Sequence, residues 1–139
     1  MPNWASNRLT LSGPHAEIMR FRNTCIRVAP EEDSDKECFD LGALVPMPPV
    51  IVATLEGRSA EAKQAAVDAT GFESWYDWCI AHWGCKWNTS NLQVITAAPD
   101  LIDIGFETAW SAPEPALAAL AVQFPLLSGR VCVIEEGMD

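Results

Sequence analysis

Several segments of the chain alternate apolar and polar residues, a period of two that predicts strands with one buried face. In 102–110, the even-numbered residues from Ile102 to Trp110 share a face opposite Asp103 and Glu107. Comparable patterns predict strands over 7–12, 93–97 and 130–135 and a short strand over 39–45. The dipeptide Pro99-Asp100 indicates a hairpin between 93–97 and 102–110.

Other segments space their apolar residues as an amphipathic helix does. The first such set is Ile18, Phe21, Cys25 and Val28. Pro14 suits the first turn of this helix, and Pro30 ends it. Ser59 is placed to cap an alanine-rich helix over 60–70, which Gly71 stops.

Two capping boxes predict further helices. Ser74 and Asp77 stand at the spacing of such a box and open a helix through the aromatic residues that follow. Ser111 and Glu114 stand at the same spacing before a leucine- and alanine-rich helix that closes at Pro125.

The order of these elements predicts the fold. Without residues 31–83 the chain reads strand, helix, strand, strand, helix, strand, which is the split βαβ order of a ferredoxin-like sandwich. We therefore expect an α+β fold in one domain over 1–139. The segment 31–83 forms an acidic loop followed by an α-helical insertion after the first helix. Two helices would cover one sheet face and leave the other open or covered by the insertion.

Tryptophan is concentrated in one stretch, since most of the six tryptophans lie in 75–87 (WYDWCIAHWGCKW). Such a cluster is either a core anchor or a binding surface. Apolar residues occur on most sides of this helix, which is typical of a buried helix. We therefore expect a mainly structural aromatic cluster. Its members are Trp4, Trp75, Trp78, Trp83, Trp87 and Trp110.

The net charge of −10 changes the picture of what the chain binds. Such a field repels nucleic-acid backbones and favours basic partners. The alternative interpretation of this charge is that it only keeps the protein in solution. We expect a partner-binding acidic surface made of Glu31, Glu32, Asp33, Asp35, Glu37, Asp103 and Glu107.

The remaining composition indicates a cytoplasmic protein. No apolar run approaches the ~18–20 residues that span a bilayer, and the N-terminus lacks the apolar region of a secretory signal. The five cysteines without such a signal indicate free thiols in a reducing compartment. No glycine-rich phosphate loop is present, and we expect no cofactor.

Three blocks of the sequence are distinctive: 1–9 (MPNWASNRL), 78–88 (WCIAHWGCKWN) and 106–113 (FETAWSAP). Together they resemble the YubB-type ferredoxin-like domain family, small proteins of phages and plasmids. The resemblance spans nearly the whole chain and implies the ferredoxin-like fold, but no catalytic residue. Ala5 and Cys85 stand where cysteine and threonine are usual, which argues against a shared metal or redox site.

The cysteines and histidine of the tryptophan stretch are weak candidates for chemistry. Cys79, His82 and Cys85 have the spacing of zinc ligands, but a structural site needs a fourth ligand that no nearby pair supplies. A Cys–His nucleophile would sit among tryptophans that favour an inert thiol. Asp103 and Glu107 would be ~13 Å apart along a strand, too far for a catalytic pair. We expect no enzyme and no metal.

A role in binding a host protein remains. The sequence predicts a non-enzymatic accessory protein of a phage or plasmid that inhibits a basic or nucleic-acid-binding host protein, such as a CRISPR defence complex, by mimicking phosphate charge. A homo-oligomer is compatible with the sequence. The alternative is a domain that binds single-stranded nucleic acid through its tryptophans, with Lys86 alongside.

Overall fold

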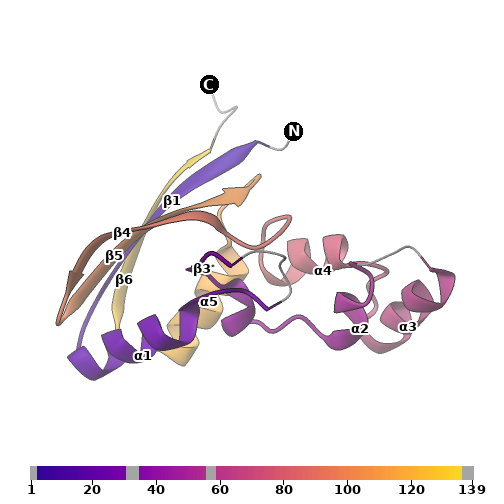
Figure 1. The fold of residues 1–139 in the computed structure, drawn as a ribbon, viewed down its shortest axis with the longest axis horizontal. Helices are drawn as coiled ribbons and strands as arrows, with labels where there is room; N and C mark the ends of the chain where they lie inside the picture. Colours follow the sequence, from indigo (N-terminus) through magenta and orange to yellow (C-terminus); the bar gives the residue numbers. More distant parts are fainter. Residues whose placement is uncertain (1–2, 31–34, 56–58, 136–139) are drawn as a thin grey trace.

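The computed structural model describes residues 3–30, 35–55 and 59–135 of the chain. It combines one antiparallel sheet with several helices, an α+β architecture (Figure 1). The sheet has the strand order β4-β5-β1-β6. Its strands are β1 (Trp4–Ser12), β4 (Ser90–Ala98), β5 (Leu101–Ala109) and β6 (Ser128–Glu135).

Two helices follow the two central strands of the sheet. Helix α1 (His15–Cys25) comes after β1, and α5 (Glu114–Gln123) connects β5 to β6. Between α1 and β4 lies a long segment with its own small elements. These are β2 (Ile26–Arg27), β3 (Cys38–Phe39), the 3₁₀ turn η1 (Leu41–Ala43), α2 (Pro49–Val52), α3 (Ala60–Thr70) and α4 (Trp75–His82).

The core lies between the sheet and the helices α1 and α5, which Figure 1 shows on the same side of the sheet. The alternating residues of β1 and β5 that face this side are buried, as the period of two predicts. Phe21 and Phe124 meet edge to face with ring centroids 5.8 Å apart, and Phe39 and Phe106 meet at 5.0 Å. The first contact joins α1 to the end of α5, and the second joins β3 to β5 of the sheet.

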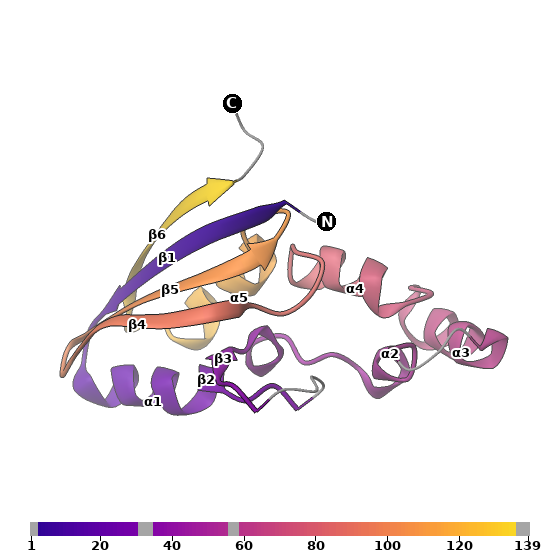
Figure 2. The same ribbon diagram turned by 45° about the horizontal axis from the view of Figure 1, so that its top comes forward.

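The inserted helices extend beyond one end of the sheet (Figure 2). Trp83 anchors them, because its buried indole Nε1 donates to the carbonyl of Val45 at 2.8 Å. Asp40 holds the base of the insertion: its buried carboxylate accepts from Arg27 at 2.6 Å and from Asn88 at 2.8 Å. Among the described residues, no helix has the length and apolar character needed to cross a membrane.

The insertion begins earlier and is less helical than the sequence predicts. The first helix ends at Cys25 instead of continuing to Pro30, because Ile26 and Arg27 pair with β3. The strand expected over 39–45 is wrong beyond Phe39, where the chain turns into η1. Pro49 starts a short helix, α2, that the sequence analysis did not predict; proline is tolerated in a first helical turn.

The capping predictions differ in outcome. Ser59 caps α3 as predicted, accepting from the amide of Ala62 at 3.0 Å. Ser74 precedes α4 but makes no side-chain cap. The box at Ser111 is also wrong, because this hydroxyl donates to the carbonyl of Gly84 at 2.7 Å and Pro113 stands at the cap of α5.

Candidate functional site

Aromatic side chains from distant parts of the chain meet near the start of β1 and the end of β5. The ring centroids of Trp4 and Trp87 lie 6.1 Å apart, and those of Tyr76 and Trp110 lie 5.6 Å apart. Trp75 contacts Tyr76 at 6.1 Å. We call these five residues the aromatic surface. Tyr76 and Trp110 are its most exposed members, with 36% and 39% of their surfaces accessible.

Lys86 lies among these rings. Its Nζ is 4.7 Å from the ring centroid of Trp87, 5.3 Å from that of Trp110 and 5.8 Å from that of Tyr76. Ammonium groups at such distances are attracted by the negative faces of aromatic rings. The aromatic surface therefore already holds one cation supplied by the chain itself.

Two turns with left-handed backbone place these side chains. Gly84 has a φ of 93° after α4, and Trp110 has a φ of 79° after β5. The amide of Trp110 donates to the carbonyl of Asn3 at 2.7 Å, which ties the ring to the start of β1. The sequence pattern places Trp110 on the core face of its strand; the structure corrects this, because the left-handed turn directs its side chain away from the core.

A pocket of about 610 Å³ lies beside Tyr76 and Trp110. Ile80 contributes to its lining, and Glu73 and Asp77 bring exposed carboxylates. We call it the acidic–aromatic pocket. Tyr76 and Glu73 also line a second pocket of about 460 Å³ that includes Lys86.

The remaining tryptophans of the cluster lie deeper. Trp78 and Trp83 are buried at 3% and 1% exposure and meet edge to face at 5.4 Å. Trp4, Trp75 and Trp87 are half-buried. The cluster thus divides into an inner pair in the core and an outer set that reaches the surface.

Asp103 does not belong to an acidic surface, which corrects the sequence prediction. It is only 6% exposed and lies beneath Arg8, whose Nη2 is 2.6 Å from its Oδ2. Thr10 donates to the other carboxylate oxygen at 3.2 Å. The hydrogen bond from Arg8 lowers the pKa of Asp103, and the pKa of Arg8 is raised in return. The open face of the sheet therefore carries a neutralised pair where a free carboxylate was expected.

The other residues of the predicted acidic surface differ in how far they are exposed. Glu107 is half-buried and accepts a hydrogen bond from Asn91. Asn91 and Glu37 line one pocket of about 300 Å³, so Glu37 and Glu107 lie at the same end of β4. Asp35 is exposed. Glu31, Glu32 and Asp33 lie outside the described residues.

The cysteine and histidine candidates for a metal or catalytic site differ in their exposure to solvent. Cys79 and Cys85 are buried, whereas His82 is exposed and stacks on Trp78 with ring centroids 4.8 Å apart. Burial raises the pKa of the Cys85 thiol to about 12, and its Sγ donates to the carbonyl of Trp87. No three of the described His, Cys, Asp and Glu side chains are grouped closely enough to hold a metal ion.

Sequence reasoning did not select Glu73, Tyr76 or Asp77. One signal was available: Glu73 and Asp77 place a carboxylate on either side of the aromatic pair Trp75-Tyr76, where a helix begins. The sequence could not predict that Trp110 lies beside these residues, because its position depends on the left-handed turn of its backbone.

Comparison with known proteins adds no assignment: no family model, curated protein or solved structure matches the chain.

Proposed function

We propose that the chain is a non-enzymatic protein-binding module that takes a basic partner at the acidic–aromatic pocket. One observation carries the proposal: the exposed rings of Tyr76 and Trp110 stand beside the exposed carboxylates of Glu73 and Asp77. An arginine side chain fits this combination, because its guanidinium stacks on an aromatic ring and pairs with a carboxylate at the same time.

The chemistry of protein interfaces supports this choice. Tyrosine, tryptophan and arginine are enriched among the few interface residues whose truncation costs the most binding energy. The net charge of −10 would attract a basic partner from a distance and raise its association rate. Lys86, which already lies over the rings of Trp87 and Trp110, is consistent with a preference of these rings for cations.

The biological setting that we propose follows from the resemblance to the YubB-type family. Under this proposal, the protein is a phage or plasmid accessory protein that acts in the cytoplasm of the host and inhibits a basic, nucleic-acid-binding host protein. A CRISPR defence complex is one such target. The strand order β4-β5-β1-β6, with helices after β1 and β5, supports the finer proposal of a ferredoxin-like fold with an insertion.

A second candidate function is the binding of single-stranded nucleic acid. The arrangement of Lys86 among tryptophan rings favours it, since bases stack on exposed aromatic side chains next to a cation. The neighbouring carboxylates of Glu73 and Asp77 oppose it, because they repel phosphates. We therefore rank it below the basic protein partner.

Tryptophan fluorescence distinguishes the two candidates. The purified protein is titrated with an octa-arginine peptide and, separately, with a single-stranded oligothymidine, each over a series of salt concentrations. We expect saturable binding of the peptide that weakens as salt rises, and no response to the oligonucleotide. Saturable binding of the oligonucleotide alone, or peptide binding that salt does not change, would overturn the proposal.

A further inference from the structure

The second pocket, of about 460 Å³, carries lysines that the proposed function does not use. Lys63, near the start of α3, and Lys86, in the segment before β4, both line it. We call it the lysine pocket. Its other lining residues come from the segment after α2, the start of α4 and the approach to β4. They are Thr54, Glu73, Ser74, Trp75, Tyr76 and Trp87.

The charges of this lining favour a ligand with a single negative charge. In the described part of the chain, no carboxylate forms an ion pair with Lys63 or Lys86. Two ammonium groups at one cavity repel each other, and a bound anion relieves that repulsion. Because Glu73 also lines the pocket, two lysines and one glutamate leave one positive charge. A carboxylate balances that charge, whereas a phosphate group brings about −1.5 to −2.

Hydrogen bonds hold the wall of the pocket in place. The hydroxyl oxygen of Thr54 accepts from the amide of Trp75 at 2.9 Å and donates to the carbonyl of Ile51 at 2.6 Å. These bonds join α2 to the start of α4. The Ser74 side chain does not cap α4, so its hydroxyl can donate to a bound anion. The pocket is therefore a preformed cavity with both charged and neutral donors for a carboxylate.

The lysine pocket and the acidic–aromatic pocket share a wall. Glu73 and Tyr76 line both of them. The Nζ of Lys86 lies 5.8 Å from the ring centroid of Tyr76 and 5.3 Å from that of Trp110, which lines the acidic–aromatic pocket. A partner segment that occupies one pocket therefore lies within reach of the other.

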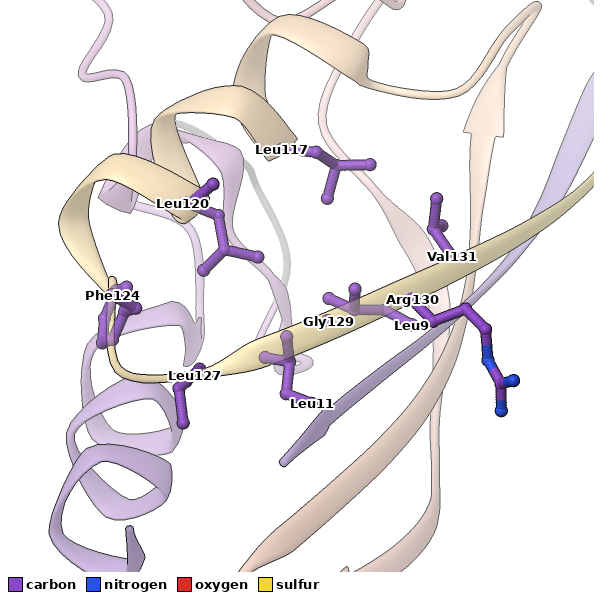
Figure 3. Close-up of a pocket in the computed structure, with 10 residues that line it drawn as sticks. Leu9, Leu11, Leu117, Leu120, Phe124, Leu127, Gly129, Arg130 and Val131 are labelled. Atoms are coloured by element: carbon purple, nitrogen blue, oxygen red, sulfur yellow. The ribbon is translucent and has the colours of Figure 1, made fainter. Parts of the chain in front are cut away.

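The apolar groove between α5 and β6 lacks this selectivity. Leucine side chains of α5 and β1 line it, and Arg130 is the one charged residue of its lining (Figure 3). Figure 3 shows the side chain of Arg130 directed away from α5. An apolar wall does not distinguish ligands by charge, whereas the lysine pocket does.

We propose that the lysine pocket takes an acidic side chain from the same partner segment that places an arginine in the acidic–aromatic pocket. The inference rests on the proposed function and narrows its partner to a basic segment with an aspartate or glutamate close to an arginine. Both side chains must lie on one face of that segment, so they are two residues apart in an extended segment or three to four apart in a helix. A purely basic segment would bring like charges to Lys63 and Lys86.

Octa-arginine peptides with one central glutamate or one central glutamine test the inference. Arginines on both sides of the central residue supply all of these spacings. Calorimetry at one salt concentration measures the dissociation constant of each peptide with the wild-type protein. Net charge alone favours the glutamine peptide, which carries one more positive charge. We expect the glutamate peptide to bind roughly 2- to 5-fold more tightly.

Lysine variants locate this preference. Lys63 is exposed on α3, so Lys63→Gln should leave the fold intact. Lys63→Gln and Lys86→Gln should each lower the preference for the glutamate peptide, because each removes a cation from the lysine pocket. Arg22→Gln removes the same charge from an exposed position on α1 and should leave the ratio of the two dissociation constants unchanged.

The outcomes separate this inference from the proposed function. If the wild type binds the glutamine peptide more tightly, or if neither lysine variant changes the preference, the inference is overturned and the proposed function stands. If octa-arginine itself does not bind, both are overturned. If adenosine monophosphate binds more tightly than the glutamate peptide and loses affinity in Lys63→Gln, the pocket takes a nucleotide and the inference is wrong.

Discussion

Asp103 shows how strongly burial and pairing decide what a single charged residue can do. Its alternation pattern placed it correctly on the open face of the sheet, opposite Ile102 and Ile104. The pattern did not show that Arg8 would cover it, because this contact depends on the register that sets Thr10 opposite Asp103. A one-residue slip would have moved every side chain to the other face.

The Arg8–Asp103 pair predicts a specific pH dependence. A carboxyl whose pKa is lowered by folding stabilises the native state above its ordinary pKa of about 3.9, and this contribution is lost as the pH falls below that value. Arg8→Met should therefore lower the free energy of unfolding most above about pH 4, and its difference from the wild type should shrink on acidification.

Urea titrations at pH values from about 7 to 2 measure this difference. Arg22→Met removes the same charge from an exposed position on α1 and serves as the control. A difference between Arg8→Met and wild type that stays constant with pH would show that the pair does not lower the pKa of Asp103.

The cysteines give a second residue-scale prediction. Burial raises the pKa of Cys25 and Cys85 to about 12, and Cys38 and Cys79 are also buried. Iodoacetamide at about pH 8 should alkylate the native protein at Cys132 and spare the other four, since the thiolate is the reactive species. Mass spectrometry of the intact and digested protein counts the adducts. Rapid modification of Cys79 would revive a Cys–His nucleophile with His82.

The elements divide into those that periodicity predicts and those that it does not. Strands β1, β4, β5 and β6 and helices α1, α3, α4 and α5 were found from their patterns, with ends displaced by a few residues. The β2–β3 pair and α2 were missed, because two-residue strands and a one-turn helix are too short to show a period. Their existence depends on tertiary contacts such as those of Asp40.

The turn after α4 gives a prediction at the scale of the element. A Cβ on Gly84 would lie 2.5 Å from Cδ of Pro115, whereas one on Gly71 would meet nothing within 4 Å, and both glycines have a positive φ. Gly84→Ala should therefore cost about 1–3 kcal/mol more free energy of unfolding than Gly71→Ala.

Urea unfolding followed by circular dichroism measures both variants. Gly71→Ala is the matched control, because it carries the left-handed strain without the close approach. Equal losses would mean that α4 does not pack tightly against the start of α5.

For the whole molecule, the net charge of −10 predicts a positively charged partner. The sequence alone could not predict which surface would bind that partner. Of the acidic candidates, Asp103 is neutralised and Glu107 is half-buried. The pocket that combines Glu73 and Asp77 with Tyr76 and Trp110 forms only when the end of β5 returns to α4.

The most direct test compares two double variants that remove equal charge. Glu73→Gln/Asp77→Asn removes the carboxylates of the acidic–aromatic pocket, and Glu61→Gln/Asp68→Asn removes two exposed carboxylates from α3. The dissociation constant of the octa-arginine peptide is measured for both by calorimetry at one salt concentration. The pocket variant should bind roughly 10-fold more weakly or worse, and the α3 variant should stay within about 2-fold of wild type. If both double variants lost the same affinity for the peptide, binding would depend on net charge alone and not on the acidic–aromatic pocket, which would contradict the proposed function.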